Sequence, residues 1–237
     1  MKLLKLFKKD RRELHPLIAR NHQAFQNFEK NLPLHEYELV VLDTELTGLK
    51  VNKAEIVAIG AVKIRNLRIQ CAETFYALVQ PDDPLHTSST LIHRITPGEL
   101  QMAKKLKEIL PAFLEFCGDA IQIGHYLRLD LEFLNAASNN LLGGALKTPY
   151  LDTMRLAMAY NEAKHGHYYE HSNIHGAYTL DALSKEFGLP SFPAHNALND
   201  SFQAAYLFLY LANKMKDYGF RTLDDYLKAG RNWKIIL

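Results

Sequence analysis

The side chains best suited to chemistry lie in three short segments that are far apart in the sequence. Asp43 and Glu45 lie in the first segment, VVLDTELTGL, where an apolar run predicts a buried strand that ends in an acidic turn. Residues i and i+2 of a strand point to the same face, so the two carboxylates should project together. Two neighbouring carboxylates repel each other and cost stability unless a cation lies between them. The alternative is a strand that simply ends in polar residues, with Asp43 opening a turn.

The second segment, IGHYLRLDLEFL, carries a third carboxylate, Asp130. It follows another predicted strand by six residues and lies in the first turns of a predicted helix. Taken alone, Asp130 could be an ordinary exposed carboxylate, because acidic residues are favoured near a helix N-terminus in any protein.

The third segment, FPAHNALNDSFQAAYLF, carries His195 and Asp200. Five residues along a helix change direction by about 140°, so the two side chains converge only if His195 precedes the helix. Pro193 and a capping Asn196 would allow that arrangement. Asp200 would then be fixed on the helix, as a metal ligand should be, whereas His195 would lie on a loop where a proton-transfer group can move. The alternative is a capping loop with an incidental histidine.

The elements that must position these residues are predicted from hydrophobic periodicity. Strands are expected at residues 37–42, 55–64, 68–79, 120–124 and 149–151, and helices at residues 1–30, 97–116, up to 142, from 153, 179–187, 196–215 and from about 222. Three early strands followed by alternating helices and strands predict an α/β fold with a mixed sheet, antiparallel first and parallel later.

In order, spacing and element type, the three segments resemble the motifs of the DEDDh exonucleases. This is the family of the proofreading epsilon subunit of bacterial DNA polymerase III, ribonuclease T and oligoribonuclease. It carries an Asp-x-Glu after the first strand, an Asp in the second motif and a His-x4-Asp in the last helix region. The resemblance covers roughly residues 37–212 and includes the segments IHRIT, LDTMRLA and TLDALSKEFGL between the motifs.

The resemblance implies a ribonuclease-H-like mixed five-stranded sheet flanked by helices, and a 3′→5′ exonuclease that releases nucleoside 5′-monophosphates. It assigns two Mg²⁺ or Mn²⁺ ions to the carboxylates of Asp43, Glu45, Asp130 and Asp200. Two cations roughly 3.5–4 Å apart neutralise the attacking and leaving oxygens, and hard oxygen ligands suit these ions. His195 would activate the water, because a histidine pKa of about 6.5 is close to neutral pH.

Three further residues are expected to contact the substrate, which would be a nucleic acid with a free 3′ end. They are Thr44, Leu46 and His125. Leu46 stands where the family usually has Thr and should touch the 3′-terminal nucleotide. His125 matches a family histidine, although a structural histidine is an equally good interpretation. Tyr126 and Leu129 replace the usual Asn and Phe, which puts the substrate contacts around Asp130 in doubt.

Charge and composition divide the chain into three predicted parts. Residues 1–34 form a basic helical extension with eight basic and three acidic groups, a net charge of +5, which leaves −3 for the rest. Residues 35–215 form the exonuclease domain, and residues 216–237 a short helix and tail. The extension could be a helical lid, a phosphate-binding arm, or a sliding-clamp-binding peptide through Leu3 to Phe7.

The cysteine count and the length of the apolar runs indicate the cellular compartment. Two distant cysteines, Cys71 and Cys117, exclude a disulfide framework and favour the cytoplasm, and no apolar run is long enough to span a membrane. Two other functions stay open. One is an RNA-trimming 3′→5′ exoribonuclease, and the other is an inactive nuclease fold that serves as a nucleic-acid-binding or partner-docking module.

Overall fold

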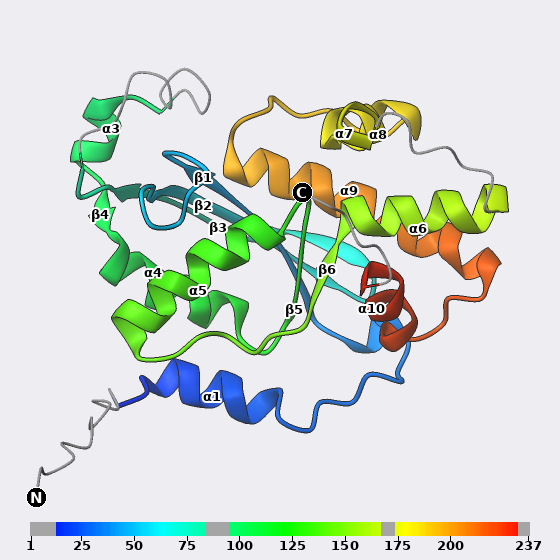
Figure 1. Ribbon diagram of the computed structural model, residues 1–237, viewed down its shortest axis with the longest axis horizontal. Coiled ribbons are helices and arrows are strands. Elements are labelled where there is room, and N and C mark those ends of the chain that lie inside the picture. The colour runs from blue at the N-terminus through cyan, green and yellow to red at the C-terminus, as the bar shows by residue number, and fades with distance from the viewer. Residues whose placement is uncertain (1–12, 84–94, 167–173, 232–237) are drawn as a thin grey trace, which may run out of the picture.

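The computed structural model describes residues 13–83, 95–166 and 174–231, and its centre is a six-stranded mixed sheet (Figure 1). The strands are β1 (Leu39–Leu46), β2 (Ile56–Arg65), β3 (Arg68–Gln80), β4 (Lys104–Lys105), β5 (Ile121–Gly124) and β6 (Tyr150–Asp152), in the order β4-β3-β2-β1-β5-β6. The strands β1, β2 and β3 are antiparallel, and β5 and β6 run parallel to β1. The predicted α/β fold with its mixed sheet is confirmed.

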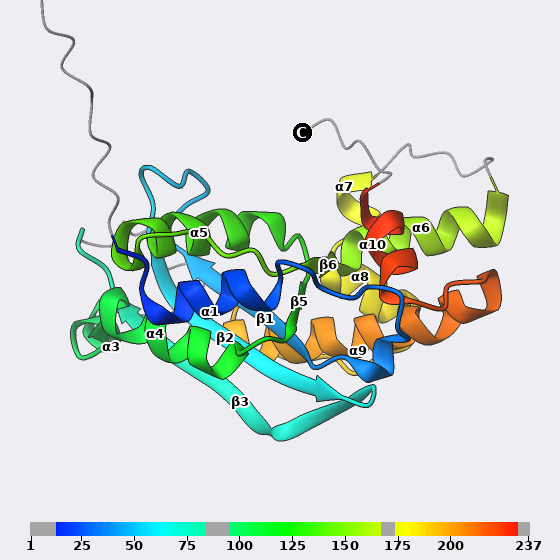
Figure 2. The same ribbon diagram turned by 90° about the horizontal axis from the view of Figure 1, so that it is seen from below.

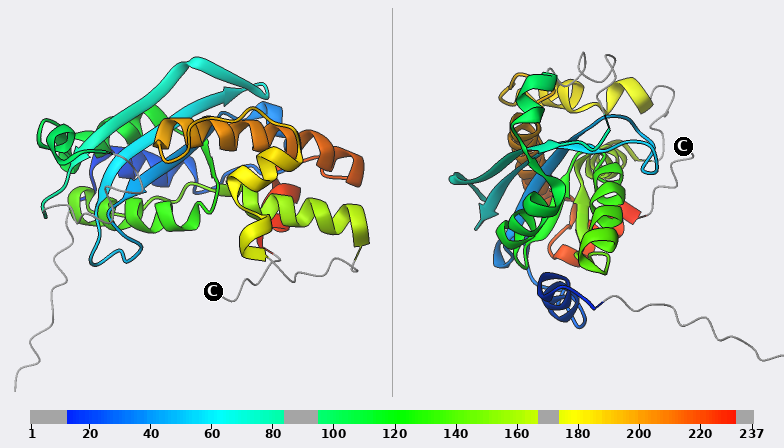
Figure 3. Two further views of the ribbon diagram at one scale, coloured as in Figure 1. Left: turned by 90° about the horizontal axis from the view of Figure 1, so that it is seen from above. Right: turned by 90° about the vertical axis from the view of Figure 1, so that its left-hand side faces the viewer.

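The first half of β1, Leu39 to Leu42, is apolar because it is buried on both faces of the sheet. Leu39 and Val41 face one side, and Val40 and Leu42 face the other, and all four are at most 1% exposed. Helices cover each side of the sheet (Figures 1 and 3). On the Val40 side lie α1 (Pro16–Ala24), α4 (Leu106–Cys117) and α5 (Arg128–Leu142). On the Leu39 side lie α6 (Thr153–His165), α8 (Leu180–Glu186), α9 (Ala197–Met215) and α10 (Leu223–Arg231).

The strands β2 and β3 form a hairpin, in line with the predicted antiparallel arrangement of the early strands. Arg65 pairs with Arg68, so Asn66 and Leu67 form a two-residue turn, and both have positive φ angles of 50° and 56°. This is the backbone conformation that matches the twist of paired strands. From the turn, β3 runs along the outer edge of the molecule (Figure 2).

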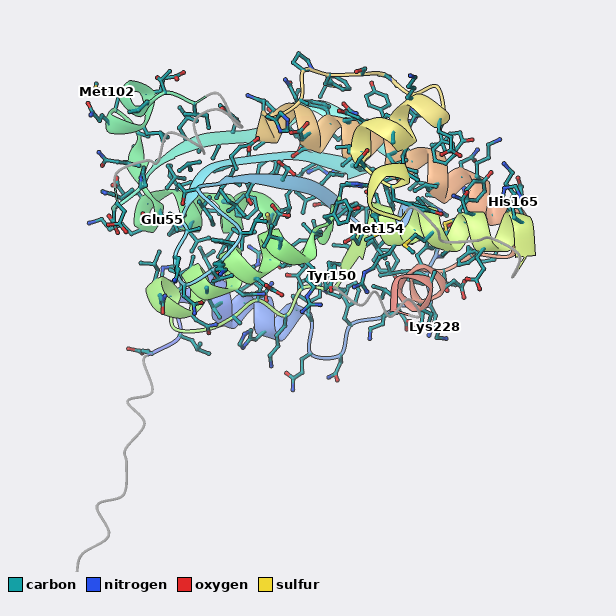
Figure 4. The ribbon with its side chains drawn as sticks, turned by 45° about the horizontal axis from the view of Figure 1, so that its top comes forward. Glu55, Met102, Tyr150, Met154, His165 and Lys228 are labelled. Carbon is teal, nitrogen blue, oxygen red and sulfur yellow. The ribbon has the colours of Figure 1, made fainter. Side chains whose placement is uncertain are left out.

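The expected single helix over residues 97–116 is wrong, as is the count of five strands. The chain forms a short α3 (Pro97–Gln101), which begins with a capping box between Thr96 and Glu99, and then leaves the helix. Lys104 and Lys105 pair as β4 with the end of β3 before α4 begins. Met102, at the break, is 89% exposed and lies at the outside of the molecule (Figure 4). The apolar residues keep helical spacing through residues 102–105, but there the backbone pairs with the edge of the sheet instead of continuing the helix.

The described part of the N-terminal extension is packed on the domain. The helix α1 is shorter than expected and ends at Ala24. Ile18 is fully buried, the Asn21 side chain donates to Thr148 Oγ1 at 2.7 Å, and Arg20 pairs with Asp119. Residues 1–12, including the clamp-like Leu3 to Phe7, lie outside the described residues. The three-part division of the chain therefore stays a prediction.

The histidines between Lys164 and Tyr178 lie in a segment that is partly helical. The helix α6 continues to His165, and α7 (Ile174–Ala177) follows, whereas residues 167–173 are outside the described residues, as is Trp233. Among the described helices, none combines the length and the hydropathy that a membrane span requires.

Candidate active site

Asp43 and Glu45 leave the end of β1 on the side of the sheet that α9 covers. Their neighbours Leu39 and Val41 on that side are core residues packed with α9, so the two carboxylates replace core side chains where the sheet ends. Asp43 pairs with Gly60 of β2, and Glu45 pairs with Ala58. The neighbours of both carboxylates on β2 are thus small residues, which leaves room above the sheet.

The helix α9 uses this room to approach β2. A Cβ atom on Gly60 would lie 2.2 Å from the backbone carbon of Ala197 and the nitrogen of Leu198, so only glycine permits the contact. The Ser201 hydroxyl, fully buried, lies 2.9 Å from the Gly60 carbonyl oxygen. This contact brings the first turn of α9 over Asp43. Carboxylate oxygens of Asp43, Glu45 and Asp200 lie within 4.8 Å of one another.

Asp130 reaches the same place from the other side of the sheet. A Cβ atom on Gly124 would lie 2.8 Å from the carbonyl oxygen of Leu42, so glycine lets the end of β5 and the start of α5 approach β1 closely. Asp130 Oδ1 accepts hydrogen bonds from the Thr44 amide at 3.0 Å and from the Thr44 hydroxyl at 2.5 Å. The hydroxyl of Thr44 therefore holds Asp130, and the predicted contact of Thr44 with substrate stays a prediction.

The pKa values of all four carboxylates are raised, and burial is the largest cause for each. Burial, together with Asp200 and Asp130, raises the pKa of Glu45 to about 7. Burial likewise raises the pKa of Asp130 to about 7, against the opposing hydrogen bonds from Thr44. Burial and then the other three carboxylates raise the pKa of Asp43 well above its usual range, and burial raises that of Asp200. A cluster of this kind has a deficit of positive charge that divalent cations would fill.

We expect the metal-free protein to lose stability as pH rises from about 4.5 through 7. In that window the folded carboxylates keep protons that the unfolded chain has released, because their folded pKa values are raised. A divalent cation binds the ionised form, so Mn²⁺ should raise the melting temperature by several degrees at about pH 8 and by less at about pH 5.5. Thermal unfolding in EDTA or Mn²⁺ at both pH values measures this. An equal or larger gain at the lower pH would contradict it.

His195 lies on the loop just before α9, as predicted. Its side chain is exposed, its φ angle is +63°, and its amide donates to Asp200 Oδ2 at 3.0 Å. Asn196 is the N-cap of α9, and its side-chain oxygen accepts a hydrogen bond from the Asn199 amide at 3.1 Å. The backbone of His195 is thus tied directly to one carboxylate of the cluster.

His125 and Leu46 are positioned mainly by protein contacts. The two ring nitrogens of His125 lie 2.9 Å from Thr153 Oγ1 and 2.9 Å from the Tyr178 carbonyl oxygen, and burial lowers its pKa to about 4. These contacts favour the structural interpretation of His125, and its contact with substrate stays a prediction. Leu46 is partly buried and packs with the core on the α4 and α5 side of the sheet.

Two residues near the cluster had not been predicted as part of it. Asp152 caps α6 by accepting a hydrogen bond from the Met154 amide, and it also accepts one from the Tyr126 amide at 3.2 Å and raises the pKa of Asp130. Tyr76 of β3 pairs with Gly60, which pairs with Asp43, so the three form one row across the sheet. Only the strand register could have revealed Tyr76.

Replacing Gly60 with alanine should displace the first turn of α9, because the new methyl group would collide with helix backbone rather than with a flexible side chain. We expect a loss of about 1–3 kcal/mol of unfolding free energy, and a weaker gain in melting temperature from Mn²⁺ because Asp200 moves. Urea and thermal unfolding with and without Mn²⁺ measure both effects. Gly98→Ala, at an exposed site where the methyl group meets nothing within 4 Å, is the control. An unchanged response to Mn²⁺ would contradict the role of this contact.

Comparison with known proteins gives a consistent match. Residues 40–208 match the family described as Exonuclease. The chain is 30% identical over 209 residues to DNA polymerase III PolC-type of Thermotoga maritima, which covers 88% of this chain and 14% of that protein. It is 35% identical over 206 residues to a DNA polymerase III subunit epsilon-like protein of Rhodobacter capsulatus, covering 84% and 28% respectively. The chain thus spans less than a third of either relative.

A smaller relative matches over most of its length. DNA polymerase III subunit epsilon of Aquifex aeolicus is 29% identical over 176 residues, which are 74% of this chain and 81% of that one. Among solved structures, Exonuclease X in complex with 5′ overhanging duplex DNA has a TM-score of 0.57 at 22% identity, covering 81% of this chain and 99% of that one. E. coli Exonuclease I with a dT13 oligonucleotide has a TM-score of 0.65 at 15% identity, covering 76% and 42%. These two structures share the fold.

Proposed function

The chain belongs to the DEDDh exonuclease family, and from this premise we propose that it removes nucleoside 5′-monophosphates from the 3′ end of single-stranded DNA. It is a metal-dependent nuclease that acts on nucleic acid. The observation that carries the proposal is the cluster of Asp43, Glu45 and Asp200, whose oxygens lie within 4.8 Å, next to Asp130 and the His195 loop. The His195 loop is residues 190–196.

The donor set fits divalent cations. It consists of four carboxylates, which are hard oxygen ligands, and their raised pKa values express the missing positive charge. We propose that Asp43, Glu45, Asp130 and Asp200 hold two Mg²⁺ or Mn²⁺ ions. When bound, such a pair would neutralise the oxygens of the phosphate and lower the pKa of the attacking water.

The protein residues would position the carboxylates and transfer the proton. Thr44 fixes Asp130, and the α9 contact with Gly60 fixes Asp200, so these carboxylates are held rigidly for their ligands. His195, exposed and one residue outside the helix, would accept the proton of the water at a ring nitrogen as the water attacks phosphorus. The bond to the 3′ oxygen of the penultimate nucleotide breaks, and the nucleotide leaves with its 5′ phosphate.

DNA is the proposed substrate because the relatives include DNA polymerase III subunits and the structural neighbours are complexes with DNA. A purified-protein assay tests the proposal, using 5′-labelled single-stranded DNA, duplex DNA, mismatched duplex and RNA of matched sequence with Mg²⁺ or Mn²⁺. Shortening of the DNA by one nucleotide at a time from the 3′ end is the expected result. Faster trimming of RNA would shift the substrate to RNA. No loss of 3′ nucleotides from any substrate would overturn the proposal.

We also propose a cytoplasmic location and binding to a sliding clamp. The two distant cysteines favour a reducing compartment. The clamp rests on the short segment Leu3 to Phe7 alone. Binding of the full chain to a bacterial sliding clamp, compared with a variant in which Leu6 and Phe7 are alanine, tests it, and equal binding by the two proteins would exclude this segment.

A further inference from the structure

Tyr76 lies at the edge of the candidate site although no motif points to it. Paired residues of antiparallel strands share a face, so Tyr76, Gly60 and Asp43 project toward α9 in one row. Gly60 has no side chain, and the first turn of α9 occupies its place. The phenol of Tyr76 therefore flanks the N-terminus of α9, on the side away from β1. Its side chain is large and apolar, yet the residue is 43% exposed.

The contact that Tyr76 makes is with the residue after His195. The Asn196 side-chain nitrogen donates to the Tyr76 hydroxyl at 3.5 Å, while the Asn196 side-chain oxygen caps α9. The side-chain oxygen of Asn196 thus caps α9, while its side-chain nitrogen binds Tyr76 of β3. Burial, with Glu45 and Glu99 nearby, raises the pKa of the Tyr76 phenol, so the hydroxyl is a neutral partner at the rim of an acidic cluster.

Within the described part of the chain, the other side-chain hydrogen bonds of the His195 loop lead to α9. The Phe192 amide donates to Gln203 Oε1 at 3.2 Å, the Asn199 side chain donates to the Pro193 carbonyl at 3.1 Å, and the His195 amide donates to Asp200. These bonds tie the loop to the helix that follows it. The bond from Asn196 to Tyr76 ties it to the sheet that carries Asp43 and Glu45.

His195 needs such an anchor for two reasons. Its side chain is exposed, so packing does not fix the ring. Its positive φ angle of 63° is a conformation that costs free energy for a residue other than glycine, so the loop holds it only while its contacts are kept. A general base must also be placed within hydrogen-bonding reach of the water, and small displacements are costly.

We propose that Tyr76 is a positioning residue, which holds the His195 loop against β3 through the side chain of Asn196. The proposal rests on the proposed function, in which His195 is the base. In this role Tyr76 acts through Asn196 and is not itself a metal ligand or a base. Its loss should therefore lower kcat and leave KM and metal binding unchanged.

Two substitutions cut the contact from opposite sides. Tyr76→Phe keeps the ring and removes the hydroxyl. Asn196→Ser keeps a good N-cap for α9 but is too short to reach β3. At saturating Mn²⁺, each should lower kcat about three- to tenfold, the range that one hydrogen bond supports, with KM changed less than about twofold. The double variant should be no slower than the slower single variant, because both remove the same contact. Tyr218→Phe, at a comparably exposed tyrosine of the η3 turn (Lys216–Tyr218), is the matched control.

A second measurement does not depend on activity. Amide hydrogen exchange of His195 and Asn196 in the metal-free protein should be about three- to tenfold faster in Tyr76→Phe than in wild type, and unchanged in Tyr218→Phe. A raised KM with normal kcat in Tyr76→Phe, additive losses in the double variant, or wild-type exchange would each overturn the proposal. The proposed function fails separately, if wild type is inactive or if His195→Asn is as fast as wild type.

Discussion

Replacing Asp43 with asparagine is expected to lower kcat by about a thousandfold or more and, at the same time, to stabilise the metal-free protein. Asp43 interacts with all three other carboxylates, because Asp130, Asp200 and Glu45 each raise its pKa. Loss of a ligand shared with these carboxylates should remove several kcal/mol of transition-state stabilisation, which corresponds to this loss of rate. Asparagine has nearly the same shape but no charge, so the cost of burying the Asp43 charge and its repulsion by the other carboxylates disappear. We expect a gain on the order of 1 kcal/mol at about pH 8.

The two halves of this prediction need separate measurements. Single-turnover digestion of 5′-labelled DNA in Mn²⁺ gives the rate, and urea unfolding in EDTA gives the free energy. Asp119→Asn is the matched control, because Asp119 is exposed and pairs only with Arg20 among the described ion pairs. It should leave the rate unchanged. If Asp43→Asn were both inactive and less stable without metal, Asp43 would be a structural residue rather than a ligand of a metal-binding site.

The parts of the site that lie within one segment were predictable from sequence. Asp43 and Glu45 share a face because a strand has a period of two, and His195 falls before α9 because Asn196 can cap the helix. The order of the motifs, their spacing and the apolar runs around them supplied the family and the α/β fold. Strand periodicity and helix capping are local properties, and the order and spacing of the motifs can be read directly from one sequence.

What the sequence did not reveal depends on contacts between segments. Gly60 appears in the sequence as one small residue in a strand, and only the packing of α9 explains why a side chain is excluded there. The role of Thr44 in holding Asp130 depends on the start of α5, which lies far from Thr44 in the sequence. The strand β4 has two residues, Lys104 and Lys105, and no strand pattern, so only its partner in β3 defines it. Strand register and the close approach of a helix to a sheet both depend on residues that are far apart in the sequence.

Replacing His195 with asparagine is expected to lower kcat by about 10²–10⁴-fold, the range for loss of a general base, while metal binding is kept. Asparagine is the right substitution because it tolerates the positive φ angle of 63° at this position, so the loop and the bond from its amide to Asp200 should survive. The ring of His195 is exposed, and among the described residues its nitrogens do not belong to the group of ligand atoms that lie within 4.8 Å of one another. The gain in melting temperature from Mn²⁺ should therefore match wild type.

The contrast with Asp43→Asn separates the two roles. Both variants should be nearly inactive, but only Asp43→Asn should lose the stabilisation by Mn²⁺, because only there is a ligand removed. Equal loss of that stabilisation in His195→Asn would make the histidine a metal ligand. Wild-type activity in His195→Asn would assign the proton transfer to another group. His195 lies before the N-cap of α9 and is tied to Asp200 by its own amide, and in the proposed mechanism this position lets the ring of the base adjust while the carboxylates stay fixed.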